Sequence, residues 1–559
     1  MTGAVGIGGI ARAWLAQDPD DVTRTELAGL IARAEAGETD AVADLHDRFD
    51  TRLQFGTAGL RGALGAGSNR MNRVLVSQAA AGFAAYLRSR ATGATPVVVI
   101  GYDGRRNSDV FARDSAELFA GAGLRAILLP RLLPTPVLAF AVRHLGADAG
   151  VMVTASHNPP DDNGYKVYLG GADEGSQIVS PADAEIAAHI EAVAAASVVG
   201  DMPRGEYELA DEAVVEAYVS ATALVAPAPR GAGELNWVYT AMHGVGYETL
   251  AKIVERAGYP LPTVVTAQID PDGRFPTVAF PNPEEPGAMD LTFETARAVG
   301  AEFALANDPD ADRLAVAIPD AAGWRRLTGN EVGLLLGWQA GARASGSGSL
   351  ACSLVSSPGL QAIAEHYGLG FHTTLTGFKW ISRAPGLIYG FEEALGYLVN
   401  PSTVRDKDGI SAAVAMLGLI AEARERGQSV ADLLAQFQET FGYFQSGQVS
   451  LRVDDVSIIG RIMAALRAAP PAALGEVAVD RFDDLLTPDA SSTPGDGLPP
   501  SDVLRLWLAD GSRVIVRPSG TEPKLKVYLD VRGTSAPDAD ARLAALDAAA
   551  RGLVATAQA

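Results

Sequence analysis

The feature that most limits the fold of this chain is a rhythm of short apolar runs separated by helical segments. Its first round begins with "PVVVIGYDG" and ends with "GVMVTA". The apolar runs and the helical segments between them follow the order 96–104, 108–122, 125–130, 136–146 and 150–155. Alternation of this kind is typical of βαβ units and predicts a mainly parallel sheet.

The same rhythm restarts twice, without a clear repeat of the sequence itself. Strand-like runs occur in the second round at 235–241, 262–266 and 302–308, and in the third at 349–355, 371–375 and 386–392. A long helical segment at 408–427 closes the third round. Because 559 residues are too many for one core, we expect three similar mixed α/β domains.

The two ends of the chain follow other patterns. Residues 11–50 are typical of helices. Near the C-terminus, strand-like runs follow one another closely at 448–455, 503–510, 512–520 and 524–533, with helical segments near 457–468 and 537–557. This pattern predicts an α+β domain with an antiparallel sheet. The predicted divisions are a helical arm at 1–48, domains at 49–205, 206–321 and 322–443, and the C-terminal domain at 444–559.

Composition excludes some classes of function. A net charge of −22 argues against nucleic acid as a partner, since its phosphates require a basic face. Small phosphorylated ligands remain possible because they need only a local positive pocket. The single cysteine, Cys352 in the apolar stretch "SLACSLV", excludes an internal disulfide and fits a reducing cytosol. The sequence shows neither a basic, apolar leader nor a run of eighteen apolar residues, so we expect a cytoplasmic protein without a membrane helix.

Each predicted domain ends one strand in a polar, charged or glycine-rich loop. These loops read "TASHNP", "NDPDADR", "GFEEALGY" and "RPSGTEPK". In open α/β sheets, ligands lie at the carboxyl ends of strands. Four such loops, one in each domain, therefore predict a central cleft shared by all four domains.

The loop "NDPDADR" places Asp308, Asp310 and Asp312 at alternate positions. Carboxylates this close repel one another unless a cation neutralises them, and hard cations prefer oxygen ligands. The residues at the sixth and twelfth positions do not fit an EF-hand. A solvated acidic turn is the alternative. The apolar flanks "EFALA" and "LAVAI" favour the metal because they place the carboxylates between two buried strands.

The loop "TASHNP" places Ser156 where an apolar strand ends. Serine, asparagine and proline are turn formers, so a plain turn is one interpretation; a nucleophile or phosphate carrier is the other. A serine hydrolase would require Gly-x-Ser-x-Gly, which is absent here. For His157, the neighbouring residue, we favour a local turn contact over the role of a base.

The remaining loops offer groups that bind anions and hydroxyls. In "RPSGTEPK", a guanidinium, two hydroxyls and backbone amides suit a phosphate dianion, although a hairpin turn with an incidental arginine is an alternative. Glu392 and Glu393 would accept hydrogen bonds from sugar hydroxyls, or form a solvated loop. "FGTAGLRG", with Arg61 near its end, would bind an anion or turn a corner. In "RPSGTEPK", the residues that would bind the phosphate are Arg517, Ser519, Gly520 and Thr521.

In this order, the four loops resemble those of the α-D-phosphohexomutase superfamily. "FGTAGLRG", "TGFKW", "DKDG" and the helical arm look most like the subgroup that includes phosphopentomutase and glucose-1,6-bisphosphate synthase members. The resemblance implies that Ser156 carries a phosphoryl group. It also implies that Asp308, Asp310 and Asp312 hold one Mg²⁺ per chain together with a phosphoserine oxygen.

The same resemblance assigns roles to further residues. Lys166 and Arg61 match positions that line the reacting centre, and Lys407 matches a lysine considered a general acid or base. A lysine that acts as a base must have a pKa lowered below about 10.4, by burial or by a neighbouring cation. Surface lysines are the alternative. His157 is kept as a catalytic candidate. The substrate-binding positions implied are Arg313, Thr376, Gly377, Lys379, Glu392 and Glu393, and the phosphate-binding positions Arg517, Ser519, Gly520 and Thr521.

The function implied is the interconversion of sugar 1-phosphate and 6-phosphate through a phosphoserine enzyme and a sugar bisphosphate, which is both activator and intermediate. Phosphoglucomutase activity is expected first, with phosphomannomutase or phosphopentomutase as alternatives. Ala394 stands where many relatives have a serine after Glu-x, so a hydroxyl contact to the sugar is missing. A non-catalytic sugar-phosphate sensor is the competing class, and a phosphatase the nearest enzymatic one. We expect a monomer or homodimer.

Overall fold

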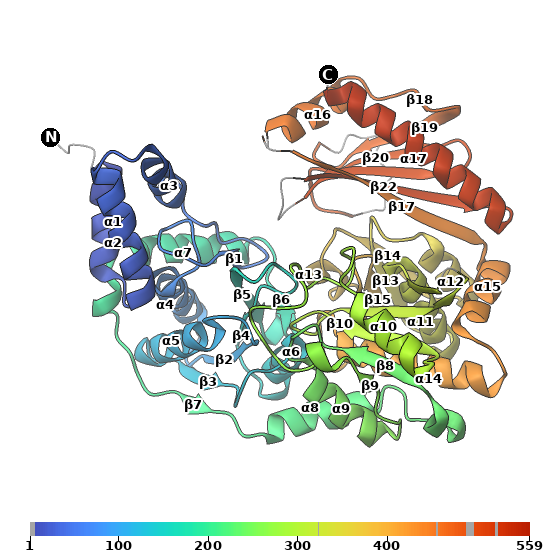
Figure 1. Ribbon diagram of the computed structural model, residues 1–559, viewed down its shortest axis with the longest axis horizontal. Helices are drawn as coiled ribbons and strands as arrows, with labels where there is room; N and C mark the ends of the chain where they lie inside the picture. The colour runs from blue at the N-terminus through green and yellow to red at the C-terminus, as the bar shows by residue number, and fades with distance from the viewer. Residues whose placement is uncertain are drawn as a thin grey trace. The chain divides into compact units, whose positions relative to one another are not determined.

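The computed structural model describes residues 6–321, 323–453, 455, 457–487, 497–519 and 524–558 (Figure 1). The chain divides into two compact units. The first holds Met1–Leu327 and Gly396–Ala421, and the second holds Thr328–Leu395 and Glu422–Ala559. No helix within the described ranges combines the length and apolar character needed to cross a bilayer.

The first unit opens with three helices, as the sequence predicts for this region. They are α1 (Ile7–Gln17), α2 (Asp21–Glu35) and α3 (Thr39–Phe49). The Asp20 side chain caps α2 by accepting a hydrogen bond from the Val22 amide. Trp14 of α1 meets the ring of Phe49 edge-on, with ring centroids 5.9 Å apart, which ties α1 to α3.

The first sheet is mixed and has the order β1-β5-β4-β2-β3-β7, with β6 paired to β5. The strands are β1 (Leu60–Ala63), β2 (Val97–Tyr102), β3 (Arg125–Leu128), β4 (Ala149–Val153), β5 (Asp162–Leu169), β6 (Ser176–Gln177) and β7 (Glu208–Leu209). Strands β4, β2, β3 and β7 are parallel, as predicted. Strand β5 runs antiparallel to β4, since the Pro159–Pro160 turn returns the chain at once beside the strand it has left. This hairpin brings Lys166 opposite Met152, close to the end of β4.

Helices cover both faces of the first sheet because every strand alternates its side chains. Val98 and Ile100 share a hydrophobic core with Phe83 and Phe119, which belong to helices on one face. On the other face Gly101 lies against Leu138. The helices are α4 (Arg73–Arg90), α5 (Ser108–Gly121), α6 (Thr135–His144) and α7 (Ala182–Ala196), with short 3₁₀ helices η1 (Gly171–Asp173) and η2 (Val199–Asp201).

The second sheet of this unit has the order β12-β11-β10-β8-β9. Strands β10 and β11 are antiparallel and both buried, and Asn307 pairs with Leu314, so 308–313 form the loop between them. The elements are α8 (Ala213–Ala223), η3 (Arg230–Glu234), β8 (Trp237–Thr240), α9 (Gly246–Ala257), β9 (Thr263–Val264), η4 (Thr266–Gln268), α10 (Asp290–Val299), β10 (Phe303–Asn307), β11 (Leu314–Asp320), β12 (Gly323–Arg326) and, later in the chain, β16 (Gly396–Leu398). Helix α14 (Gly409–Glu425) belongs to this unit up to Ala421.

The second unit begins with parallel strands in the order β14-β13-β15. Thr328 and Glu331 form a capping box at the start of its first helix, which satisfies two terminal amides. Cys352 is buried in the central strand, as expected. The elements are α11 (Gly329–Arg343), β13 (Ser349–Ser353), α12 (Gly359–Tyr367), β14 (Gly370–Thr374), α13 (Phe378–Ile381), β15 (Leu387–Glu392) and α15 (Val430–Phe441).

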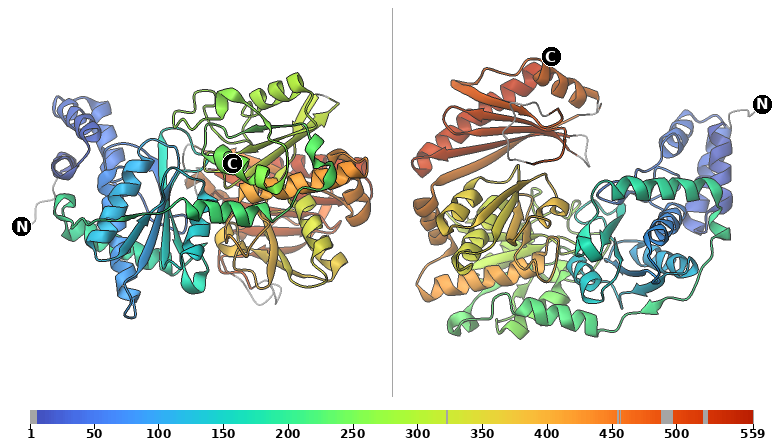
Figure 2. Two further views of the ribbon diagram at one scale, coloured as in Figure 1. Left: turned by 90° about the horizontal axis from the view of Figure 1, so that it is seen from below. Right: turned by 180° about the vertical axis from the view of Figure 1, so that it is seen from behind.

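The C-terminal part of this unit is an antiparallel sheet in the order β17-β22-β21-β20-β19-β18, which confirms the predicted fold class. Helices α16 (Ser457–Ala468) and α17 (Ala536–Gln558) cover one face (Figure 2). On the other face Ile515 and Tyr528 pack against Leu354 and Leu375. The strands are β17 (Tyr443–Arg452), β18 (Ala473–Leu474), β19 (Val477–Asp484), β20 (Leu504–Leu508), β21 (Arg513–Pro518) and β22 (Lys524–Gly533).

Candidate active site

Ser156 lies just beyond β4, buried to 2% exposure. Its backbone has φ 53°, a left-handed conformation that a serine rarely adopts and that often marks functional sites. Its amide donates to Thr154 Oγ1 at 2.9 Å, and its Oγ donates to Asp308 Oδ2 at 2.9 Å. The serine hydroxyl and the acidic loop, 152 residues apart in sequence, therefore meet directly.

Arg105 holds the serine loop in place, a role that the sequence did not reveal. Its guanidinium donates to the carbonyl oxygens of Ser156 at 2.6 Å and Pro159 at 2.9 Å. Asp103 in turn accepts from Thr154 Oγ1 at 2.6 Å. The loop after β2 thus fixes the loop after β4, because the two parallel strands end at the same edge of the sheet.

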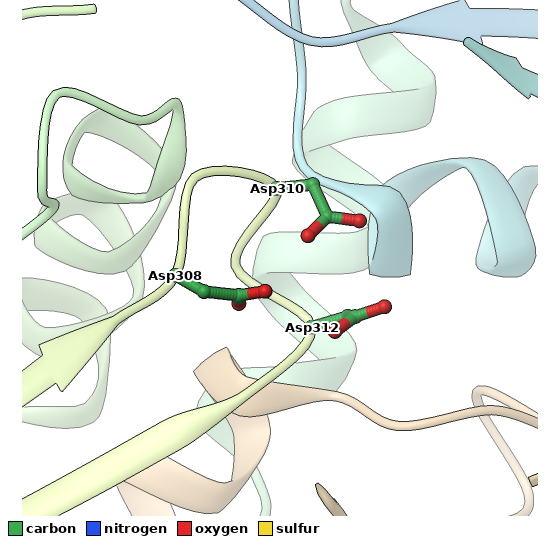
Figure 3. Close-up of side chains that lie close together, drawn as sticks. All are labelled: Asp308, Asp310 and Asp312. Carbon is green, nitrogen blue, oxygen red and sulfur yellow. The ribbon is translucent and has the colours of Figure 1, made fainter. Parts of the chain in front are cut away.

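The carboxylates of Asp308, Asp310 and Asp312 converge in the turn between β10 and β11 (Figure 3). Each offers an oxygen within 4.8 Å of the others, and all three residues are fully buried. Asp310 Oδ1 and Asp312 Oδ1 have no hydrogen-bond partner in the described part of the chain. Buried carboxylate oxygens without partners are costly, and an all-oxygen set of this charge fits a hard divalent cation. The turn can therefore hold a metal ion.

Burial and neighbouring charges shift the pKa values of Asp308 and Asp312 in opposite directions. Burial, followed by the charges of Asp310 and Asp312, raises the pKa of Asp308 well above its ordinary value. For Asp312 burial also acts to raise the pKa, but Lys166, Lys407 and Arg313 outweigh it and lower the value. The neighbouring cations therefore favour the ionised form of Asp312.

Two buried lysines face the same carboxylates. Lys166 Nζ lies 2.6 Å from Asp310 Oδ2 and 2.7 Å from Asp312 Oδ2, and Lys407 Nζ lies 3.1 Å from Asp312 Oδ2. Burial opposes both ammonium charges, yet the neighbouring carboxylates outweigh it and raise the pKa of each lysine. This corrects the expectation of lysine pKa values lowered by burial, because here anions surround the ammonium groups. The surface-lysine alternative is wrong for both residues.

Three further predicted residues gather around Ser156. His157 Nδ1 lies 3.2 Å from Ser156 Oγ, although neighbouring residues usually point apart, and burial lowers the pKa of the imidazole well below its ordinary value. Arg61 on β1 donates to Asn158 Oδ1 at 3.3 Å. The Arg313 amide donates to Asp308 Oδ1 at 3.0 Å.

The loop that carries Lys407 is anchored by two tyrosines. Asp406 Oδ2 accepts from Tyr168 Oη at 2.8 Å, and Asp408 accepts from Tyr218 Oη at 2.9 Å. Tyr168 and Lys166 project to the same face of β5, since strand side chains alternate. One strand therefore positions both the first lysine and, through Asp406, the segment that bears the second.

In the second unit, Glu392 and Glu393 follow β15. Glu392 Oε1 accepts from the Gly377 amide at 3.0 Å, and Glu393 Oε2 accepts from the hydroxyls of Ser353 at 3.2 Å and Ser356 at 3.1 Å. Burial and the charge of Glu392 raise the pKa of Glu393 to about 7. The pair is therefore built into the protein rather than being a solvated loop.

Thr376, Arg517 and Ser519 line one cavity of about 270 Å³ in the same unit. The charge of Arg517 acts to lower the pKa of Glu393, which places the guanidinium near the glutamate pair. Lys379 lies on α13, two residues beyond Gly377, the N-cap of that helix. Gly520 and Thr521, also predicted to bind phosphate, fall outside the described residues.

Comparison with known proteins gives the family. Models for the four successive domains of phosphoglucomutase/phosphomannomutase proteins match residues 52–197, 216–323, 328–441 and 460–547. The first three are described as alpha/beta/alpha domains I to III and the last as the C-terminal domain. The chain belongs to the α-D-phosphohexomutase superfamily.

Two relatives and one structure illustrate the range of this superfamily. A probable phosphomannomutase of Haemophilus influenzae is 56% identical, with 86% of this chain and 97% of the relative covered. The phosphopentomutase of Homo sapiens is 35% identical, with 93% and 90% covered. A phosphoglucomutase/phosphomannomutase family protein of Burkholderia thailandensis has the same fold, with a TM-score of 0.70, 21% identity and coverage of 91% and 98%. The chain is thus an enzyme, a phosphomutase of the isomerase class.

Gly244 lies against the acidic loop of this phosphomutase and is a first target for mutation. A Cβ at Gly244 would lie 2.3 to 2.7 Å from backbone atoms of Pro309, whose carbonyl accepts from the Val245 amide at 2.9 Å. We expect Gly244→Ala to displace the loop, weaken Mg²⁺ binding at least tenfold and destabilise the fold by about 1–3 kcal/mol. Thermal melting with and without Mg²⁺ measures both effects.

Gly233→Ala is the matched control, because a Cβ there meets nothing within 4 Å. It should leave the melting temperature and its response to Mg²⁺ unchanged. An unaltered Mg²⁺ response in Gly244→Ala would show that this contact does not position the carboxylates.

Proposed function

We propose that this enzyme interconverts the 1-phosphate and 6-phosphate of a hexose, glucose foremost, through a phosphorylated Ser156 and a sugar bisphosphate. The observation that carries the proposal is the hydrogen bond of 2.9 Å between Ser156 Oγ and Asp308 Oδ2 inside a buried acidic cluster. A hydroxyl held at a potential metal site, with two ammonium groups on the same carboxylates, suits reversible phosphoryl transfer.

A carrier serine solves a geometric problem. Phosphate cannot readily pass between O1 and O6 of one sugar in a single in-line step, but two transfers through a serine need only one reacting centre. PhosphoSer156 gives its phosphoryl group to the free hydroxyl of the sugar, which forms the bisphosphate. After the intermediate reorients, its other phosphate returns to Ser156 Oγ, and the isomeric monophosphate is released. Phosphorus, charge and protons balance over the cycle.

Asp308, Asp310 and Asp312 would hold one Mg²⁺, with an oxygen of the phosphorylated Ser156 as a further ligand. The two carboxylate oxygens without hydrogen-bond partners, Asp310 Oδ1 and Asp312 Oδ1, support this assignment. A bound Mg²⁺ supplies Lewis-acid stabilisation of charge on the phosphoryl oxygens.

His157, Lys166 and Lys407 would transfer protons and compensate the charge of the phosphoryl group. His157 Nδ1 lies 3.2 Å from Ser156 Oγ, and its lowered pKa leaves a neutral imidazole that can accept a proton from the attacking hydroxyl. Lys166 and Lys407, whose pKa values are raised, remain ammonium ions that offset the charge of the phosphoryl group or return a proton. Arg61 would contact the same group.

The second unit would recognise the rest of the substrate. We assign sugar hydroxyls to Glu392 and Glu393, and the phosphate that does not react to Arg517 and Ser519. A guanidinium with neighbouring hydroxyls gives bidentate recognition of a phosphate dianion. The other proposed substrate contacts are Arg313, Thr376, Gly377 and Lys379, with Gly520 and Thr521 completing the phosphate loop.

Phosphopentomutase activity is the second candidate. It is favoured by the human phosphopentomutase, 35% identical over 93% of this chain, and by Ala394 after the glutamate pair. Alanine offers no hydroxyl contact to a sugar, so recognition of the larger hexose ring would lack one hydrogen bond.

Specific activities on the 1-phosphates of glucose, mannose and ribose test the proposal. Each assay contains Mg²⁺ and a trace of glucose 1,6-bisphosphate, and we expect the highest kcat/KM with glucose 1-phosphate. A value at least tenfold higher with ribose 1-phosphate would establish the second candidate instead. Absence of turnover with all three sugars, by an enzyme of native melting temperature, would contradict the proposed function.

A further inference from the structure

A second cavity, of about 350 Å³, lies within the second unit where the C-terminal sheet faces β13, β14 and α12. Cys352, Phe371 and Thr373 line it from one side, and Trp507, Arg513 and Arg532 from the other. None of its lining residues belongs to the cavity of Thr376, Arg517 and Ser519. A volume of this size is in the range of small-molecule sites.

Strand β21 contributes one arginine to each cavity from the same face, and the distance along the strand separates them. Arg513, Ile515 and Arg517 project to one face of the strand, since side chains alternate along it. Arg513 lines the second cavity, Ile515 is fully buried in a hydrophobic cluster, and Arg517 lines the first cavity. The two arginines lie roughly 13 Å apart along the strand, at about 3.3 Å per residue. A ligand in the second cavity would therefore not occupy the position assigned to the phosphate in the proposed function.

Positive charge gathers around the second cavity. The guanidinium groups of Arg481, Arg505 and Arg513 lie 4.7, 5.2 and 5.9 Å from the centre of the Trp507 ring. Asp483 pairs with both Arg481 at 3.2 Å and Arg505 at 2.9 Å. Asp483 therefore holds two of these arginines beside the Trp507 ring.

Arg513 and Arg532 complete this charge pattern. Asp530 pairs with Arg513 at 2.6 Å. Arg532, at the exposed rim, stacks over Phe444 and donates to the Phe441 carbonyl at 3.2 Å, and it has no carboxylate within ion-pair distance in the described part of the chain. The lining also includes Glu365, so within it Arg505, Arg513 and Arg532 lie beside the carboxylates of Glu365 and Asp530, a local excess of arginine in a chain of net charge −22.

We propose that this cavity is a binding site for a small phosphorylated metabolite, separate from the catalytic site. Arg532 contacts the phosphate at the rim, and the field of Arg505 and Arg513 holds the anion. The faces of Trp507 and Phe371 contact the apolar side of the ligand. The chain therefore offers a second place for a phosphate ester, one that spans the two sheets of the second unit.

Cys352 makes the site measurable, because it lines the cavity and is the only cysteine of the chain. The probe is inorganic pyrophosphate, titrated in EDTA at constant ionic strength. The rate of Cys352 alkylation by iodoacetamide is followed by intact mass at pH 9, since burial raises the pKa of this thiol to about 12. We expect pyrophosphate to slow alkylation at least threefold. In Arg532→Gln the half-maximal concentration should rise at least fivefold.

Two control variants and a second readout make the result decisive. Arg461→Gln removes an arginine from an exposed position of α16, outside the cavity, and should bind pyrophosphate as the wild type does. Arg517→Gln should also bind it normally. Tryptophan fluorescence gives an independent titration, and its change should be lost in Trp507→Phe. The proposal is overturned if neither readout responds to pyrophosphate, or if the response is lost in Arg517→Gln but kept in Arg532→Gln. Neither readout requires turnover, so failure of the proposed mutase function would be distinguishable.

Discussion

Ser156→Ala is expected to lower mutase turnover at least about 10³-fold, because the variant has no oxygen to carry the phosphoryl group. The loss should appear in kcat, while sugar-phosphate binding, measured by protection against thermal unfolding, remains. Intact mass provides a second readout, since a phosphorylated serine adds about 80 Da. We expect this adduct on the wild type after incubation with glucose 1,6-bisphosphate and none on the variant.

The fold should survive this substitution, because within the described ranges the Ser156 hydroxyl donates to Asp308 and contacts His157, while Arg105 holds the loop through backbone carbonyls. Ser89→Ala, at an exposed position near the end of α4, is the matched control and should retain both the mass adduct and full turnover. Near wild-type turnover in Ser156→Ala, or an adduct of the same mass on it, would contradict the phosphoserine mechanism.

The fold class was accessible from the sequence because hydrophobic periodicity and turn residues are local signals. Strands β2, β3 and β4 fell where the apolar runs predict them, and the polar loops after them were recognised by position. Strand β19 was missed. Its sequence, "VAVDRFDD", carries charges on a half-exposed strand near the edge of a sheet, where the apolar pattern is weak.

The sequence predicted which residues belong to the candidate site, but it did not predict which of them contact one another. Nothing local indicates that Ser156 would meet Asp308, or that Asp406 would accept from Tyr168, 238 positions away. Arg105 and Thr135 were missed for the same reason: Thr135 Oγ1 donates to Asp310 Oδ2 at 2.6 Å across 175 positions. Such contacts depend on which strand ends share an edge, and that is a property of the folded topology.

The sequence also did not indicate whether the pKa values of the two lysines are raised or lowered. Burial alone would have lowered the pKa of Lys166, and the sequence showed no carboxylates beside it. Only the hairpin of β4 and β5, together with the turn that follows β10, brings Asp310 and Asp312 to this ammonium group. Burial and the neighbouring carboxylates act on the pKa of Lys166 in opposite directions, and the short distances to Asp310 and Asp312 make the net shift upward.

Asp310→Asn is expected to abolish the response of the protein to Mg²⁺. In the wild type, a cation that binds only the native state stabilises it by RT ln(1 + [Mg²⁺]/Kd), about 2.7 kcal/mol at a hundred times Kd. Asparagine keeps an oxygen that can accept from Thr135 Oγ1 and Lys166 Nζ, so the loop should retain its anchors. It removes one negative charge from the cluster, and we expect Mg²⁺ affinity to fall at least about 100-fold, judged from the loss of one of three charged ligands.

Thermal melting across a Mg²⁺ titration measures this effect without relying on turnover. Asp320→Asn, at the exposed end of β11, removes the same charge from the strand that follows the acidic turn, outside the cluster, and should keep the wild-type response. A stabilisation by Mg²⁺ in Asp310→Asn equal to that of the wild type would exclude Asp310 as a ligand. The partnerless oxygens of Asp310 and Asp312 would then need another source of compensation, and Lys166, which already lies within 2.7 Å of both residues, would be the cation that the acidic turn was built to bind.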